Sequence, residues 1–119
     1  MEKLTNQRCV PCEGGIPPMT REEAEEYLSQ VPSWRIVEDE GIFKLNKTFK
    51  FNNFRESWQF FDRIAELAES EGHHPDISVH YNRVIVTLFT YAIKGLFLND
   101  FIMAAKIEEI LKELQKGHR

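Results

Sequence analysis

The chain has 119 residues, 42% of them hydrophobic and 29% charged, which suits one folded domain and excludes a disordered chain. The net charge of -4 argues against nucleic acid as the main ligand, because phosphate binding needs a basic surface. No apolar run is long enough to span a bilayer, and no charged and then apolar leader opens the chain. We therefore expect a cytoplasmic protein that neither crosses a membrane nor binds nucleic acid.

Residues 1–19 predict an irregular arm ahead of a single domain at 20–116, because the arm is rich in proline and glycine. The arm also contains the pair Cys9 and Cys12. Such a pair can be half of a zinc site, but a structural site needs four ligands and the chain has no second cysteine pair. A redox motif would need a strand before it, which the pattern does not offer. We expect reduced, non-catalytic thiols in a mobile arm.

A helix and a hairpin follow the arm. Thr20 predicts the helix N-cap, Glu23 completes a capping box, and Pro32 ends the helix. Residues 34–51 predict a hairpin that turns at Gly41. The hydrophobic strand residues of this hairpin are Trp34, Ile36, Ile42, Phe43, Leu45, Phe49 and Phe51.

Residues 53–72 give the clearest helical pattern, with Asn53 as the N-cap and Gly72 at the stop. The predicted buried stripe consists of Phe54, Trp58, Phe61, Ala65 and Ala68, widened by Phe60, Ile64 and Leu67. The predicted polar side consists of Arg55, Gln59, Asp62, Glu66 and Glu69. Two adjacent histidines therefore come directly after a helix C-terminus.

The rest of the chain predicts a second hairpin over 76–92, with Asn82 and Arg83 near its turn, and a last helix over 97–116. The inward stripe of that helix is Met103, Ile107, Ile110, Leu111 and Leu114. The predicted fold class is α+β, in the order α-β-β-α-β-β-α. A four-stranded antiparallel sheet with the helices on one face is the simplest way to bury these stripes.

The other face of the sheet carries Ile85 and Phe89, on the side opposite the apolar core residues of their strand. Apolar side chains on a nominally open face suggest a protein partner. The simplest partner is a second copy, so we expect a homodimer or homotetramer that assembles through this face.

The segment His73-His74-Pro75 carries the chemistry of the chain. Histidine titrates near neutrality, so two histidines at the rim of a cleft could serve one substrate as base and acid. Neighbouring side chains of an extended segment point to opposite faces, which makes joint ligation of one metal difficult. A metal site of His73, His80 and Asp76 stays conceivable. In the structural alternative, His73 caps the helix carbonyls and His74 is merely exposed.

Asp100 falls on the inward side of the last helix, near its N-terminus. The simple interpretation is that its charge complements the helix dipole in the first turn. The alternative is a carboxylate that orients a histidine or a substrate.

At these residues the sequence resembles the pterin-4a-carbinolamine dehydratase family. The segments "YNRVIVTL" and "GL", with "AAKIEEI" in the following helix, resemble the family too, and the arm is similar to that of bacterial members. The likeness covers nearly the whole chain. Its signature residues here are Glu69, His73, His74, Pro75, Tyr81, Tyr91 and Asp100.

The resemblance implies the loss of water from a 4a-hydroxytetrahydropterin, which gives a quinonoid dihydropterin in tetrahydrobiopterin recycling, with no metal or organic cofactor. It implies that His73 and His74 are the proton-transfer and binding pair, with Asp100 as the supporting carboxylate. Its expected catalytic residues are His73, His74, Asp100 and Tyr91. Its expected substrate-binding residues are Glu69, Pro75, Phe89 and Thr90, of which the strand end would offer backbone groups to the pterin edge.

Two residues depart from the family pattern. Tyr91 stands where a third histidine is usual, and tyrosine is a poor proton shuttle at neutrality because its ordinary pKa is about 10. His80, in a neighbouring strand, is a candidate substitute. Phe97 stands where a Thr or Ser cap is common, and it would instead shape the pocket wall or join the apolar face at Phe89.

Three functions are therefore compared. The first is an active dehydratase. The second is a catalytically weak member that binds a pterin or a protein, which Tyr91 and Phe97 favour. The third is a purely structural oligomeric module, which leaves the spacing of the signature residues unexplained.

Overall fold

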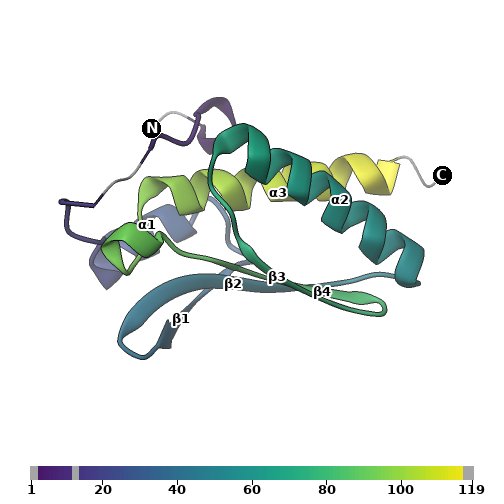
Figure 1. Ribbon diagram of the computed structural model, residues 1–119, viewed down its shortest axis with the longest axis horizontal. Helices are drawn as coiled ribbons and strands as arrows, with labels where there is room; N and C mark the ends of the chain where they lie inside the picture. Colours follow the sequence, from purple (N-terminus) through teal and green to yellow (C-terminus); the bar gives the residue numbers. More distant parts are fainter. Residues whose placement is uncertain (1–2, 12–13, 117–119) are drawn as a thin grey trace.

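Every predicted helix and strand forms in the computed structural model, which describes residues 3–11 and 14–116 (Figure 1). Two short 3-10 turns, η1 and η2, add to them. The α+β prediction is therefore confirmed. The elements are η1 (Leu4–Asn6), α1 (Arg21–Leu28), β1 (Arg35–Asp39), β2 (Ile42–Lys50), α2 (Phe54–Glu71), β3 (Asp76–His80), β4 (Arg83–Leu88), η2 (Tyr91–Ile93) and α3 (Leu98–Lys116).

Local sequence signals set the boundaries of these elements. Thr20 and Glu23 form the predicted capping box at the start of α1. Asn53 accepts a hydrogen bond from the Glu56 backbone N–H at the start of α2. The turn between β1 and β2 has positive φ at both Glu40 and Gly41, 51° and 80°, which suits a two-residue hairpin turn.

The sheet has four antiparallel strands in the order β1-β2-β4-β3. The two hairpins are thus joined by pairing of β2 with β4, from Leu45 opposite Leu88 at one end to Lys50 opposite Arg83 at the other. Helices α2 and α3 lie side by side over one face of the sheet (Figure 1). None of the described helices is both long and apolar enough to cross a membrane.

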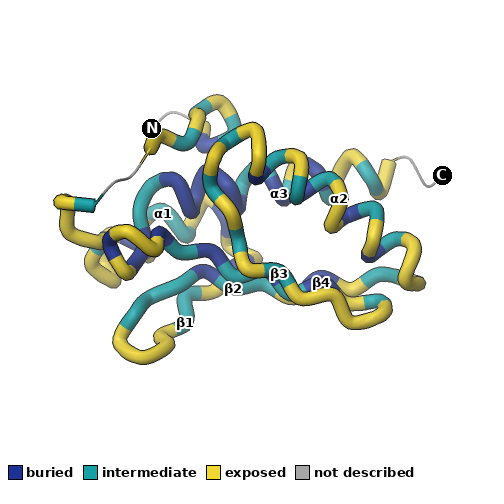
Figure 2. The backbone as a smooth tube through the Cα atoms, in the orientation of Figure 1, coloured by how far each residue is buried: buried dark blue, intermediate teal, exposed yellow. Residues whose placement is uncertain are grey.

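The core is formed by buried residues of both the helices and the sheet, whose backbone is dark blue in Figure 2. Its fully buried side chains include Leu45, Val84, Val86 and Leu88 from the sheet and Phe60, Ile64, Phe101, Met103 and Ile107 from the helices. Fully burying one such side chain contributes roughly 1.5–3 kcal/mol, so this layer is the main source of stability.

The predicted buried stripe of α2 is partly wrong. Phe54, Trp58 and Phe61 are 51%, 48% and 36% exposed. The buried residues of this helix are Ser57, Phe60, Ile64 and Ala68. The two stripes are neighbours on the helix surface, about 100° apart. The sequence made both apolar, and only packing against the sheet selected one of them.

The start of α3 is buried on all sides rather than along one stripe, over residues 99–104. The cause is the N-terminal arm, which covers the side of α3 that the sheet does not. Leu4 is 2% exposed and belongs to the core, and hydrogen bonds join Cys9 and Val10 to helix residues. The expectation of a mobile arm is therefore wrong for residues 3–11. Cys12 lies outside the described residues.

The outer face of the sheet is more polar than predicted. Ile85 is half-buried and pairs with Thr48 and Ser78 on that face. Phe89 is half-buried too, and the Lys44 ammonium lies 4.4 Å from the centre of its ring. Assembly through this face stays a prediction.

Candidate active site

The two histidines follow α2 at a left-handed glycine. Gly72 has φ 66° and ψ 27°, a conformation that costs glycine little, and it lets the chain leave the helix sharply. The backbone N–H groups of Gly72 and His73 both donate to the Ala68 carbonyl. Backbone groups therefore finish the helix, so the alternative in which the His73 side chain caps it is wrong.

The His73 side chain is held by Asp100 instead. The distance from His73 Nε2 to Asp100 Oδ1 is 2.6 Å, and the two side chains are 12% and 0% exposed. With the carboxylate ionised, Nε2–H donates to it, and Nδ1 is left as the hydrogen-bond acceptor of the ring. No hydrogen bond from the described residues engages Nδ1. A ring fixed in this way is suited to accept a proton from a ligand.

Asp100 is fully buried because it has several polar partners. Its Oδ2 accepts hydrogen bonds from the Thr90 hydroxyl at 2.9 Å and from the Phe97 backbone N–H at 3.0 Å. The second bond is half of a capping box, in which the side chain of the third helical residue binds the N–H before the helix. Asp100 thus supplies the cap that Phe97 cannot give, and it orients His73 at the same time.

His74 is in a different environment, although it is the next residue. Its Nε2 contacts the Glu69 carboxylate, but the two side chains are 61% and 79% exposed. Solvent-exposed pairs of this kind contribute about 0–1 kcal/mol and fix little geometry. His74 is therefore free to turn at the rim of the site and to exchange protons with water.

Both histidines border one cavity of about 330 Å³. Among the described residues, its lining consists of Val10, Gly72, His73, His74, Phe89, Thr90, Tyr91, Ala92 and Asn99. The side chains of His73 and His74 point to different partners, as expected for neighbours, yet they share this space. The volume suits a small bicyclic ligand, since ligand pockets begin at about 300 Å³.

Five of the predicted site residues line the cavity, namely His73, His74, Phe89, Thr90 and Tyr91. Asp100 lies behind His73 and Thr90, and Glu69 reaches the cavity only through His74. Pro75 is not among the described residues of the lining. The Tyr91 side chain is 78% exposed, beside the ring of Phe89 at the rim.

The backbone of Thr90 is engaged within the fold. Its N–H donates to the Gly95 carbonyl at 2.8 Å, and its carbonyl accepts from the Gly95 and Ile93 N–H groups. This bridge closes the tight turn that contains η2 and fixes the strand end beside the cavity. Thr90 therefore acts in the site first through its hydroxyl, which holds Asp100.

His80 and Tyr81 are at the far end of β3, where the chain turns back into β4 (Figure 1). Because a strand advances about 3.3 Å per residue, His80 lies roughly 20 Å from His74. The prediction that His80 could replace the third histidine is therefore wrong. Tyr81 is a turn residue, with φ 48° and 64% exposure. The described residues contain no group of three or more metal-ligating side chains that could hold a metal ion.

The sequence analysis missed four residues beside the site, namely Val10, Asn99, Glu71 and Lys106. The Glu71 carboxylate accepts from the Cys9 N–H and from Lys106 Nζ, both at 2.8 Å. Burial raises the pKa of Glu71, but the Lys106 hydrogen bond, the Cys9 N–H and the charges of Lys106 and Arg8 outweigh it and lower the pKa. No local pattern in the sequence pointed to this group, because the burial of Asn99 in the first turn of α3 is visible only in the structure.

Cys9 is a free, partly buried thiol. Burial and the neighbouring Glu71 carboxylate raise the pKa of this thiol to about 12. It therefore stays protonated at neutral pH and is a weak nucleophile, in agreement with the expectation of a non-catalytic cysteine.

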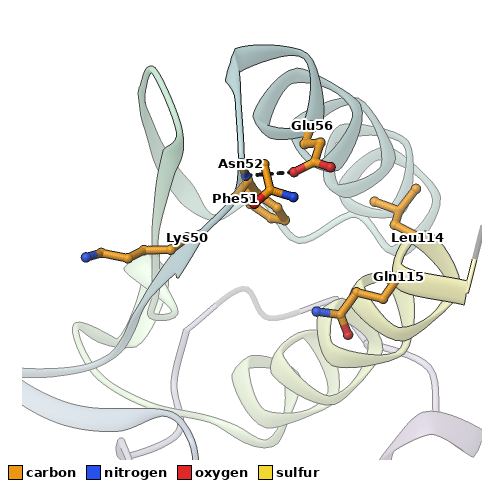
Figure 3. Close-up of a pocket in the computed structure, with 6 residues that line it drawn as sticks. All are labelled: Lys50, Phe51, Asn52, Glu56, Leu114 and Gln115. Atoms are coloured by element: carbon orange, nitrogen blue, oxygen red, sulfur yellow. Dashed lines mark hydrogen bonds between the residues drawn. The ribbon is translucent and has the colours of Figure 1, made fainter. Parts of the chain in front are cut away.

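A second hollow, of about 430 Å³, lies between the start of α2 and the end of α3 (Figure 3). It is lined by Lys50, Phe51, Asn52, Glu56, Leu114 and Gln115. Its one carboxylate, Glu56, already accepts a hydrogen bond from the Asn52 backbone N–H, and Lys50 points away from the other side chains (Figure 3). The smaller cavity, with two histidines and a buried carboxylate behind one of them, is the better candidate for an active site.

Comparisons with known sequences agree with this geometry. A sequence profile of the family described as pterin 4 alpha carbinolamine dehydratase matches residues 17–110. A protein of Chlorobium luteolum named "Putative pterin-4-alpha-carbinolamine dehydratase" is 44% identical over 114 residues, which cover 96% of this chain and 100% of that protein. A protein of the same name from Methylococcus capsulatus is 48% identical over 110 residues, which cover 92% of this chain and 95% of that protein.

Two solved structures are also similar. A transcriptional coactivator/pterin dehydratase from Brucella melitensis has a TM-score of 0.71 and 33% identity, over 78% of this chain and 97% of that one. A pterin dehydratase-like protein identified as a RuBisCO assembly factor in the alpha-carboxysome has a TM-score of 0.57 and 26% identity, over 66% of this chain and 88% of that one. From its sequence matches, the chain belongs to the pterin 4 alpha carbinolamine dehydratase family.

Proposed function

We propose that this chain removes water from a 4a-hydroxytetrahydropterin to give the quinonoid dihydropterin. The observation that carries the proposal is His73, fixed by the buried Asp100 at the floor of a cavity that His74 also borders. One histidine is thus held in place and the other is open to solvent, which is the arrangement that a coupled loss and gain of protons needs. We propose a cytoplasmic location for this reaction.

In the proposed reaction the bond between carbon 4a and its hydroxyl breaks, and a pterin ring nitrogen loses a proton as the new double bond forms. His73 accepts that proton through Nδ1, and Asp100 stabilises the imidazolium that results. His74, protonated, donates to the departing hydroxyl, which leaves as water. His73 gains one proton and His74 loses one, so proton exchange with solvent restores both rings. No metal or organic cofactor takes part.

The other predicted site residues are proposed to hold the substrate. Phe89 and Tyr91 provide aromatic surface at the rim for the flat pterin ring, and Thr90 keeps Asp100 in place. Glu69 forms a weak, exposed pair with His74, and Pro75 fixes the direction in which the chain leaves the site. Tyr91 is proposed to contact the ligand without transferring a proton, because a phenol keeps its proton at neutral pH.

The alternative is a family member that binds a pterin or a protein with little dehydration. The exposed Tyr91 in place of a third histidine favours it. The similar RuBisCO assembly factor also favours it, because that protein is named for assembly rather than for catalysis. A protein of this class would bind an oxidised dihydropterin and yet fail to accelerate dehydration.

The test is a dehydration assay in which a pterin-dependent hydroxylase generates the 4a-hydroxytetrahydropterin in place. Wild type should accelerate its decay, and His73→Ala should lose at least about 100-fold in kcat, the usual size of one general acid-base contribution. Binding of 7,8-dihydrobiopterin is measured in parallel. Binding without acceleration by the wild type would favour the alternative, and no effect of His73→Ala would refute the proposed base.

Self-association is proposed separately, through the outer face of the sheet. Its supports are the half-buried Ile85 and Phe89 on that face. Because Phe89 also lines the cavity, Ile85→Lys is the cleaner test. Light scattering should show smaller particles for Ile85→Lys than for wild type, with Trp58→Glu on the exposed side of α2 as the comparison. An effect of Trp58→Glu alone would move the interface to the helix.

A further inference from the structure

We propose that the N-terminal arm is a wall of the substrate cavity, through its residues 9–11, and that Val10 contacts the bound ligand. This inference rests on the proposed function, because the ligand is taken to be a pterin. The proposed catalytic and neighbouring site residues come from the segment after α2, the strand end and α3. The arm precedes all of them in the sequence and adds a fourth side to the same space.

This stretch of the arm is held at Cys9 by a partly buried ion pair. The Cys9 N–H donates to Glu71 Oε1, and Lys106 Nζ donates to Glu71 Oε2, each at 2.8 Å. The side chains of Glu71 and Lys106 are only 6% and 18% exposed. Charge-assisted hydrogen bonds away from water are strong, so Cys9 is fixed relative to the end of α2.

The next residue is held by an amide on α3. The Val10 N–H donates to Asn99 Oδ1 at 2.9 Å, and Asn99 Nδ2 donates to the Val10 carbonyl at 2.7 Å. Asn99 is 3% exposed, so its side chain is committed to this pair of bonds. Asn99 holds the arm and its neighbour Asp100 holds His73, so one turn of α3 positions both the wall and the proposed base.

The end of the arm contacts the chain just after the turn of η2. The Met19 N–H donates to the Leu96 carbonyl at 2.9 Å. Pro18 packs closely on Gly95. A Cβ added at Gly95 would lie only 2.4 Å from the Cβ of Pro18. Gly14 passes near Ala92, which lines the cavity. Among the described residues, the arm therefore contacts the helix ends at Cys9 and Val10 and the turn of η2 at Gly14, and Val10 lines the cavity.

The exposure of Val10 indicates that its side chain contacts a ligand rather than packing within the fold. Its backbone is held on both sides, yet the residue is 54% exposed and lines the cavity. An apolar residue with a purely structural role would turn its side chain into the core, as Leu4 does in the same arm. With Phe89 and Tyr91, Val10 gives the cavity an apolar rim above a polar floor, which suits a flat heterocycle.

The first test separates binding from chemistry. Asn99→Ala removes both bonds to Val10 and should raise KM for the 4a-hydroxytetrahydropterin about tenfold, as expected when a pre-organised wall is lost, with kcat changed less than about twofold. Val10→Ala keeps the bonds and removes only the contact, so it should raise KM a few-fold. Asn46→Ala is the matched control, because Asn46 bonds Thr87 on the outer sheet face.

The second test follows the arm directly and needs no turnover. In a Cys12→Ser chain, alkylation of the Cys9 thiol reports release of the arm, because docking buries that thiol and raises its pKa to about 12. Binding of 7,8-dihydrobiopterin should slow the alkylation, and Asn99→Ala should accelerate it and weaken the protection. A purely structural arm would respond to Asn99→Ala but not to the ligand.

The outcomes distinguish the two proposals. Dihydropterin that binds without protecting Cys9, or an unchanged KM in both Asn99→Ala and Val10→Ala, overturns the arm proposal alone. Protection of Cys9 without any dehydration supports the arm and overturns the dehydratase. Absence of dihydropterin binding by the wild type overturns both. Circular dichroism shows whether Asn99→Ala folds. If it does not fold, the KM of Val10→Ala decides.

Discussion

The floor and the rim of the site hold the same chemical pair, a histidine beside a carboxylate, in two different environments. At the floor, His73 and Asp100 are 12% and 0% exposed, and Asp100 has two further hydrogen-bond donors. At the rim, His74 and Glu69 are 61% and 79% exposed. The difference teaches that burial, rather than residue type, decides which histidine is oriented and which is free to move.

The largest expected effect comes from the floor. Asp100→Asn keeps the shape and a carbonyl oxygen for the Phe97 N–H, but it removes the charge that stabilises a protonated His73. We expect kcat to fall on the order of 10²–10⁴-fold, with a smaller change in KM. Stopped-flow dehydration measures this, and a fall of less than about threefold would mean that the buried pair has no role in proton transfer.

The next effect in size is a gain in kcat, which we expect from Tyr91→His at the rim. An imidazole at this exposed position could exchange protons near neutral pH, which the phenol cannot do, so kcat should rise by about tenfold or more. Tyr91→Phe is the control and should change kcat little, because only the phenol hydroxyl is lost. If Tyr91→Phe were as damaging as His73→Ala, the phenol would take part in the chemistry.

The pH dependence of the free energy of unfolding tests the Glu71 carboxylate, which holds the arm beside the site. The pKa of Glu71 is lowered from 4.5 in the folded chain, so its contribution is fully present above pH 4.5 and is lost as the pH falls through the lowered value. Urea unfolding at pH 7, 5, 4 and 3 should therefore show a steeper acid loss for wild type than for Glu71→Gln, by on the order of 1 kcal/mol. Parallel curves would contradict the role of Glu71.

The smallest effect is expected from Glu69→Gln at the rim. Its pair with His74 is solvent-exposed, and such pairs contribute about 0–1 kcal/mol. Both kcat and KM should stay within about twofold of wild type in the dehydration assay. A loss as large as that of Asp100→Asn would show that the two pairs are equivalent, and the comparison between floor and rim would fail.

Signals that act within a few residues predicted much of the fold. Thr20 with Glu23, Asn53 and Gly72 fixed helix ends, and the alternating apolar residues gave two hairpins, because caps and strand alternation depend on local geometry. The histidine pair and Asp100 stood out by their positions in the sequence, and the resemblance to the family supplied the other expected members of the candidate site.

Long-range packing decided the rest. Both stripes of α2 are apolar in sequence, and contact with the sheet buried Ile64 while leaving Trp58 48% exposed. Asn99 and Val10 are 89 residues apart, and no local pattern links them. Their pairing, like the different roles of His73 and His74, depends on which groups lose contact with water when the helices, the sheet and the arm come together. The sequence thus determined the elements and the reactive residues, and tertiary burial determined what each residue does.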